Sequence, residues 1–137
     1  MPNATEAELA SVYVRYTDVA AHGDSTEESI KDNQSFDLVL EIEAGQVLFN
    51  TGAKYNLSVV LNDLFDSSKT IYSNTQGGSL GDANWLKPDV KFAWTIPPGT
   101  VPLVDDHVYQ AIGVMSVGNA DPIVDMEQGE LFVVTQA

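Results

Sequence analysis

The sequence has 137 residues and no cysteine, and its six basic and twenty acidic side chains give a formal net charge of -14. A chain of this length buries an adequate core without staples, and without cysteine it has no disulfide framework, thiolate zinc site or cysteine nucleophile. Excess negative charge repels phosphates and anionic lipids, which excludes nucleic acid and membrane surfaces as partners and leaves carbohydrates, cations or basic proteins.

The N-terminal segment is polar and acidic and lacks the basic and apolar regions of a secretory signal. If Met1 is the native start, we expect a cytoplasmic protein. Residues 5–8 fit a helical capping box, but β-favouring residues follow at once, so we expect one helical turn there at most. No apolar run approaches the ~18 residues that span a bilayer.

Strand-like alternation of apolar and polar residues starts near residue 9 and recurs to the end of the chain. Four segments each place an apolar row on one face, which we expect to be buried. These rows are Val12, Val14 and Tyr16; Phe36, Leu38, Leu40 and Ile42; Tyr55, Leu57, Val59 and Leu61; and Val90, Phe92, Trp94 and Ile96. We expect Val39 to be exposed, Val47 and Phe49 to form a short hairpin strand, and residues 21–35 and 74–88 to be the longest loops.

Residues 108–117 and 131–134 carry apolar side chains at both odd and even positions. This pattern indicates central strands buried on both faces, or a surface through which copies of the chain associate. We therefore expect residues 1–137 to form a single all-β domain of seven or eight strands, arranged as an antiparallel two-sheet β-sandwich. The alternation resembles immunoglobulin-like and related sandwiches, without the Cys and Trp signature of true immunoglobulin domains.

One catalytic motif needs a context check. Residues 77–81 match G-x-S-x-G around Ser79, and Asp105 and His107 follow in the order of α/β-hydrolases. That serine works on a strained turn between a strand and a helix, and the residues after Gly81 show no helical period and include Pro88. We therefore interpret residues 77–81 as a flexible loop, and expect that the chain is not an enzyme.

Carboxylates are plentiful, and calcium prefers oxygen ligands. Asp121, Asp125 and Glu127 lie close enough in sequence to surround one calcium ion, although they match no known calcium loop. The two histidines, His22 and His107, have no metal-binding spacing. We expect no cofactor, and calcium at residues 121–127 is the candidate to test.

Aromatic side chains in loops are the candidate ligand contacts, because an exposed ring stacks on a sugar face. Trp85 lies in a polar loop, where it is either such a platform or a plug at one end of the sandwich. Tyr72 and Tyr109 are its candidate companions.

Three functions remain. The leading hypothesis is a non-catalytic binding or accessory module that recognises a carbohydrate or a protein through loops near Trp85 and residues 119–127. The alternative is a structural subunit that forms homo-oligomers through residues 108–117 and 131–134. The third is a small hydrolase that uses Ser79 or a carboxylate pair.

Overall fold

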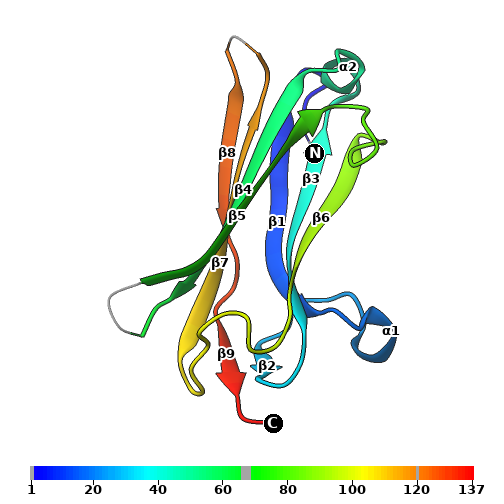
Figure 1. Cartoon of the computed structure of the whole chain (residues 1–137). Helices are drawn as coiled ribbons and strands as arrows, with labels where there is room; N and C mark the ends of the chain where they lie inside the picture. Colours follow the sequence, from blue (N-terminus) through cyan, green and yellow to red (C-terminus); the bar gives the residue numbers. More distant parts are fainter. Residues whose placement is uncertain (1, 66–68, 120) are drawn as a thin grey trace.

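Two β-sheets pack against each other in the computed structural model, which describes residues 2–65, 69–119 and 121–137 (Figure 1). The described residues form nine strands and two short helices. In chain order these are β1 (Ala7–Tyr16), α1 (Val19–His22), β2 (Ser29–Lys31), β3 (Phe36–Ala44), α2 (Gln46–Asn50), β4 (Lys54–Asp63), β5 (Lys69–Ser79), β6 (Asp89–Ile96), β7 (Val108–Val117), β8 (Ile123–Gln128) and β9 (Phe132–Thr135). The expected all-β sandwich is confirmed, with more strands than the seven or eight predicted.

The smaller sheet has the strand order β1-β3-β6, and the larger has the order β2-β9-β7-β4-β5, with β8 also paired to β7. Neighbouring strands are antiparallel except β2 and β9, which are parallel. The predicted central position of residues 108–117 is confirmed, because β7 pairs with β4 on one side and with β8 and β9 on the other. β9 lies between β2 and β7.

The core lies between the sheets and contains the four predicted apolar rows, with Val90 only partly buried at its margin. Leu38 and Leu40 of β3 and Leu57 and Val59 of β4 are fully buried. Their alternation with polar residues is the pattern of sheets that bury one face. Trp85 fills one end of this core, 5.0 Å from the Tyr55 ring and 5.9 Å from the Phe92 ring between centroids.

The structure corrects three local expectations. Val47 and Phe49 belong to the helix α2 rather than a strand. Residues 74–79 belong to the long strand β5, because the polar run pairs in regular register with β4, which supplies the apolar residues of that hairpin. Val39 is fully buried, since its neighbour across the sheet, Tyr13, is itself buried and hydrogen-bonded to Asp24 in a loop over the outer face.

Among the described residues, none of the helices is both long enough and apolar enough to span a bilayer.

Candidate functional site

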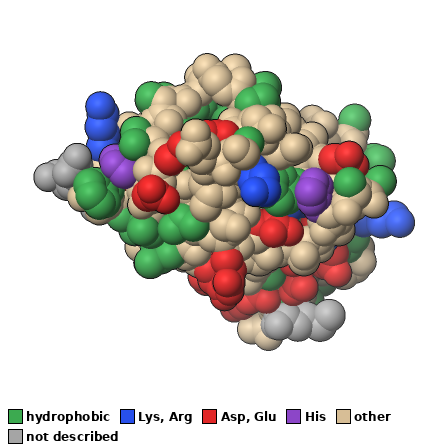
Figure 2. All heavy atoms as spheres, turned by 90° about the horizontal axis from the view of Figure 1, so that it is seen from below, with side chains coloured by type: hydrophobic (Ala, Val, Ile, Leu, Met, Phe, Trp, Pro, Cys, Tyr) green, Lys and Arg blue, Asp and Glu red, His purple; other side chains and the backbone are tan. Residues whose placement is uncertain are grey.

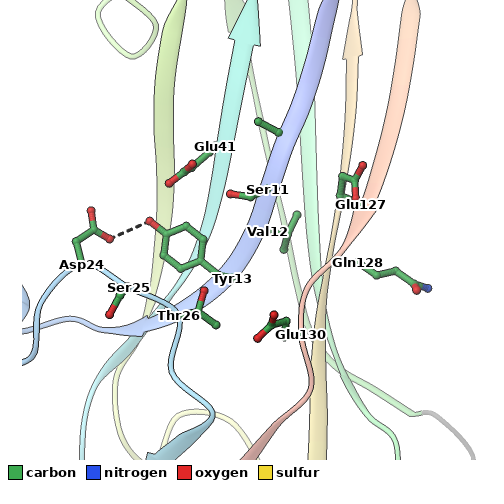
Figure 3. A pocket seen from close by; sticks show the side chains of 11 residues that line it. Ser11, Val12, Tyr13, Asp24, Ser25, Thr26, Glu41, Glu127, Gln128 and Glu130 are labelled. Carbon is green, nitrogen blue, oxygen red and sulfur yellow. Dashed lines mark hydrogen bonds between the residues drawn. The ribbon is translucent and has the colours of Figure 1, made fainter. Parts of the chain in front are cut away.

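A groove of about 500 Å³ runs along the outer edge of β1. We call it the β1 groove. It is lined by Ala10, Ser11, Val12 and Tyr13 of β1, by Asp24, Ser25 and Thr26 of the following loop, by Glu41 of β3, and by Glu127, Gln128 and Glu130. Figure 3 shows these side chains around the space between β1, the loop and the end of β8. The volume lies within the range of small-molecule sites.

A β-bulge opens the groove. The pairing of β1 with β3 shifts register between Leu9 and Ser11, which leaves Ala10 as the extra residue. Such bulges bend a strand and redirect its side chains. On either side of the groove the outer edge of β1 is closed, because Leu9 N–H donates to Asp125 Oδ2 at 2.9 Å and Val14 C=O accepts from Glu27 N–H at 3.0 Å.

Between these two contacts the main chain of Val12 faces the groove. Alternate residues of an antiparallel strand turn their hydrogen-bonding groups to the same side, so Val12, like Val14, points its N–H and C=O away from β3. The C=O lies against Gly129, where a Cβ atom would come within 2.9 Å of it. The Val12 N–H therefore points toward the groove and is a main-chain donor for a ligand.

An ion-pair network fixes the loop wall of the groove. The Asp24 carboxylate lies 2.8 Å from Arg15 Nη1 and 2.9 Å from Lys91 Nζ. It also accepts a hydrogen bond of 2.8 Å from the Tyr13 hydroxyl. Hydrogen bonds from Arg15 first, then Lys91 and Tyr13, lower the pKa of Asp24 well below its usual value. Burial, followed by the hydrogen bond to Asp24, raises the pKa of Tyr13 to about 12.

The groove carboxylates differ in their partners. Glu41 lies 3.2 Å from Lys91 Nζ. Lys91 and Arg15 together balance much of the negative charge of Asp24. Glu127 and Glu130 are exposed, and among the described residues neither has an ion-pair partner. Figure 2, which views the molecule from below, likewise shows acidic side chains gathered in patches with few basic ones. The groove therefore favours hydrogen-bond donors and disfavours anions.

The aromatic candidates lie elsewhere. Trp85 is fully buried and donates from Nε1 to Pro88 O at 3.2 Å. Of the two alternatives that the sequence allowed, it is therefore the plug and not the ligand platform. Tyr109 is also fully buried, with its hydroxyl accepting from Val104 N–H at 2.7 Å. Neither ring has a free face for stacking. Tyr72 is half-buried on β5, where its hydroxyl accepts from Asn74 Nδ2 at 3.1 Å.

The three calcium candidates have separate settings. Asp125 accepts from Leu9 N–H, Glu127 lines the β1 groove, and Asp121 is exposed in the turn before β8. Asp125 and Glu127 share one face of β8, ~6.8 Å apart along the strand. Among residues 2–65, 69–119 and 121–137, no three His, Cys, Asp or Glu side chains gather closely enough to hold a metal ion.

The hydrolase motif does not assemble. Ser79 pairs with Lys54 at one end of β4, whereas His107 binds Asp63 at the other end, with 2.8 Å between Nδ1 and Oδ2. The ten residues of β4 separate these ends by ~30 Å. Residues 77–79 are also strand rather than flexible loop, and the turn after them is held by Asp82, which accepts from the Ser79 and Trp85 N–H groups at 3.0 Å.

Sequence reasoning missed Tyr13, Asp24 and Glu41. Cross-strand pairing could have found Glu41, because it lies opposite Lys91, whereas Asp24 belongs to a loop and Tyr13 lies opposite the apolar Val39. The Glu41–Lys91 pair can be recognised only after β3 and β6 are aligned.

No family model and no curated protein sequence matches the chain. Among solved structures, the C-terminal domain of wzt has a TM-score of 0.60 at 12% identity, over 99% of this chain and 76% of that one. The fold is similar to that domain. At 12% identity this likeness shows the fold alone.

Two weaker likenesses reach TM-scores below 0.5. Spo0M, a sporulation control protein from Bacillus subtilis, gives 0.44 at 13% identity, over 94% of this chain and 50% of that one. A glycosyl hydrolase family 2 member from Bacteroides cellulosilyticus DSM 14838 gives 0.49 at 14% identity, over 90% of this chain and 14% of that one. The chain thus spans half of the first protein and a small part of the second.

Proposed function

We propose that this chain is a non-catalytic module that binds a carbohydrate in the β1 groove. The observation that carries the proposal is the composition of the groove wall. Hydroxyls of Ser11, Ser25 and Thr26, together with carboxylates and an amide, surround a cavity of about 500 Å³. Sugar hydroxyls both donate and accept hydrogen bonds, so they match a wall that combines these groups.

The charge of the wall supports a carbohydrate without phosphate or sulfate groups. Glu127 and Glu130 accept hydrogen bonds but repel anions, and hydrogen bonds to a charged acceptor are the stronger kind. The Val12 N–H adds a donor for a sugar oxygen. Tyr13 is buried, so the proposed mode is hydrogen bonding to the groove wall and not stacking on this ring.

The rigidity of the wall supports binding. Asp24 is tied to three side chains that belong to β1 and β6, and the loop is anchored again where Glu27 N–H bonds to Val14. A ligand that enters a preformed site loses less free energy to the ordering of protein groups.

The experiment is a screen of neutral and amino-containing oligosaccharides on an array. It compares the parent chain with the double variant Glu127→Gln/Glu130→Gln, and with Asp121→Asn as a control that removes an exposed carboxylate outside the groove. We expect the groove variant to weaken binding by ~10-fold or more, since two charge-assisted hydrogen bonds are lost, and Asp121→Asn to bind like the parent. Absence of any glycan binding, or equal binding by both variants, contradicts the proposal, as does cleavage of a bound glycan.

A further inference from the structure

The strand β5 ends the larger sheet on the side away from β8 and β9. It pairs with β4, and among the described residues no other strand pairs with it. It is eleven residues long, and from Thr70 to Ser79 it contains no charged residue and no proline. An open strand edge is a template for pairing with another chain, and proteins normally protect one with lysine, proline or bulges. The single register shift here lies at one end, opposite Leu61 and Asn62.

Hydrogen bonds on the two sides of β4 show which groups of β5 face outward. Leu80 N–H donates to Ala53 C=O, and Gly118 N–H donates to Lys54 C=O. With the alternation of an antiparallel ladder, the even-numbered residues of β5 bond to β4. Ser73, Thr75 and Gly77 therefore point their N–H and C=O groups out of the sheet. The Thr75 N–H meets the Asn74 side-chain oxygen of its own strand at 2.8 Å.

We propose that β5 pairs antiparallel with β5 of a second copy of this chain, around a two-fold axis at Thr75. In that arrangement Thr75 lies opposite its own counterpart, and Ser73 of each copy lies opposite Gly77 of the other. Each outward N–H then meets an outward C=O, and the Asn74 side chain releases the Thr75 N–H. Facing threonines are also a favourable cross-strand pair.

The charge distribution is compatible with a second copy of the chain as the partner at the β5 edge. Two chains of formal charge -14 repel each other, so they can approach closely only where carboxylates are absent from the contact. The central outward residues Ser73, Thr75 and Gly77 meet this condition, and the Asp82 carboxylate, which caps the Ser79 N–H, lies beyond them at the end of the strand. An isologous contact requires the same patch to complement itself, and the outward groups at Ser73, Thr75 and Gly77 do so.

The dimer leaves the β1 groove open in both copies, because β1 packs against β7 and β8, on the side of β4 away from β5. Two grooves on one particle would raise the apparent affinity for a repeating ligand. The proposal about β5 does not depend on that ligand.

Cysteine cross-linking tests the axis, and the chain has no cysteine of its own to interfere. In Thr75→Cys the two Cα atoms are ~5.5 Å apart, within the range that a disulfide bridges. The matched control is Ser73→Cys, on the same strand and face, where the two copies lie ~14 Å apart. We expect Thr75→Cys to form covalent dimers under mild oxidation at least ~10-fold faster than Ser73→Cys.

Sedimentation velocity adds a measurement without cross-linking. The parent should associate as concentration rises, whereas Thr75→Pro and Thr75→Lys should stay monomeric with an unchanged circular dichroism spectrum. The proline is tolerated because the Thr75 N–H does not bond to β4. Equal cross-linking of the two cysteine variants, or a parent that is monomeric up to millimolar concentration, overturns the proposal. The proposal is also overturned if the β5 amides become protected from hydrogen exchange only when a foreign peptide is added.

Discussion

The Tyr13 hydroxyl and the Asp24 carboxylate, 2.8 Å apart, join the loop that follows α1 to the strand β1 (Figure 3). Arg15 and Lys91 bind the same carboxylate. One side chain therefore holds a wall of the β1 groove against two strands of the smaller sheet.

Replacement of Asp24 by Asn should make the stability of the protein less dependent on acid pH. The pKa of Asp24 is lowered in the folded chain, chiefly by Arg15, so its stabilising contribution is present above the unfolded value of ~3.9 and is lost as pH falls through the lower folded value. Urea unfolding from pH 7 to pH 3 should show the parent more stable than Asp24→Asn at neutral pH, with the difference shrinking below about pH 4. A constant difference would show that Asp24 acts without its charge, and Asp121→Asn should match the parent throughout.

Truncation of Trp85 to Ala should destabilise the chain by ~3 to 5 kcal/mol, as for other buried aromatic residues. The indole is fully buried between the Tyr55 and Phe92 rings. The neighbouring Leu86, which is 66% exposed, provides the control, and Leu86→Ala should change the free energy of unfolding by less than about 0.5 kcal/mol. Chemical denaturation measures both, and a Trp85→Ala loss as small as that of Leu86→Ala would contradict the buried position.

Gly129→Ala should lower stability and disturb the groove together. A Cβ atom at this position would lie 2.9 Å from the Val12 carbonyl oxygen and 3.3 Å from that of Ala111, both in the main chain. Because the main chain of a strand moves little, we expect the free energy of unfolding to fall by ~1 to 3 kcal/mol. The exposed neighbour Gln128→Ala should leave the urea midpoint unchanged, and a neutral Gly129→Ala would mean that the segment moves freely from β1.

Calcium should raise the melting temperature no more than magnesium or sodium at matched ionic strength. Asp125 is already engaged with Leu9, and Glu127 lies in the β1 groove. A specific ion would stabilise the folded state by mass action. A calcium-specific rise in a thermal melt that is lost in Asp121→Asn would contradict this prediction and restore the site first considered at residues 121–127.

The sequence predicted the sheets far better than the groove. Period-2 rows such as Leu38 and Leu40 identify buried faces, because burial on one side of a sheet imposes that alternation. The strand β5 carries no such row, since its register comes from hydrogen bonds to β4 and not from its own side chains. Its polar residues therefore gave the pattern of a loop.

The groove depends on residues that meet only in the fold. Asp24 and Lys91 are 67 positions apart, and nothing local in the sequence relates them. For Trp85 the sequence allowed two positions, because a tryptophan in a polar segment is compatible both with a ligand platform and with a plug. The buried Tyr55 and Phe92 rings decide for the plug.

The most direct test of carbohydrate binding in the β1 groove is a titration of the isotope-labelled chain with the best oligosaccharide from the array, followed by amide chemical shifts. We expect the largest shifts at Ala10–Tyr13, at residues 24–26 and at residues 127–130, with little change at Tyr72 and Asn74 of β5. Shifts centred on Tyr72 and Asn74, with the β1 groove unchanged, would contradict the account and move the ligand to β5.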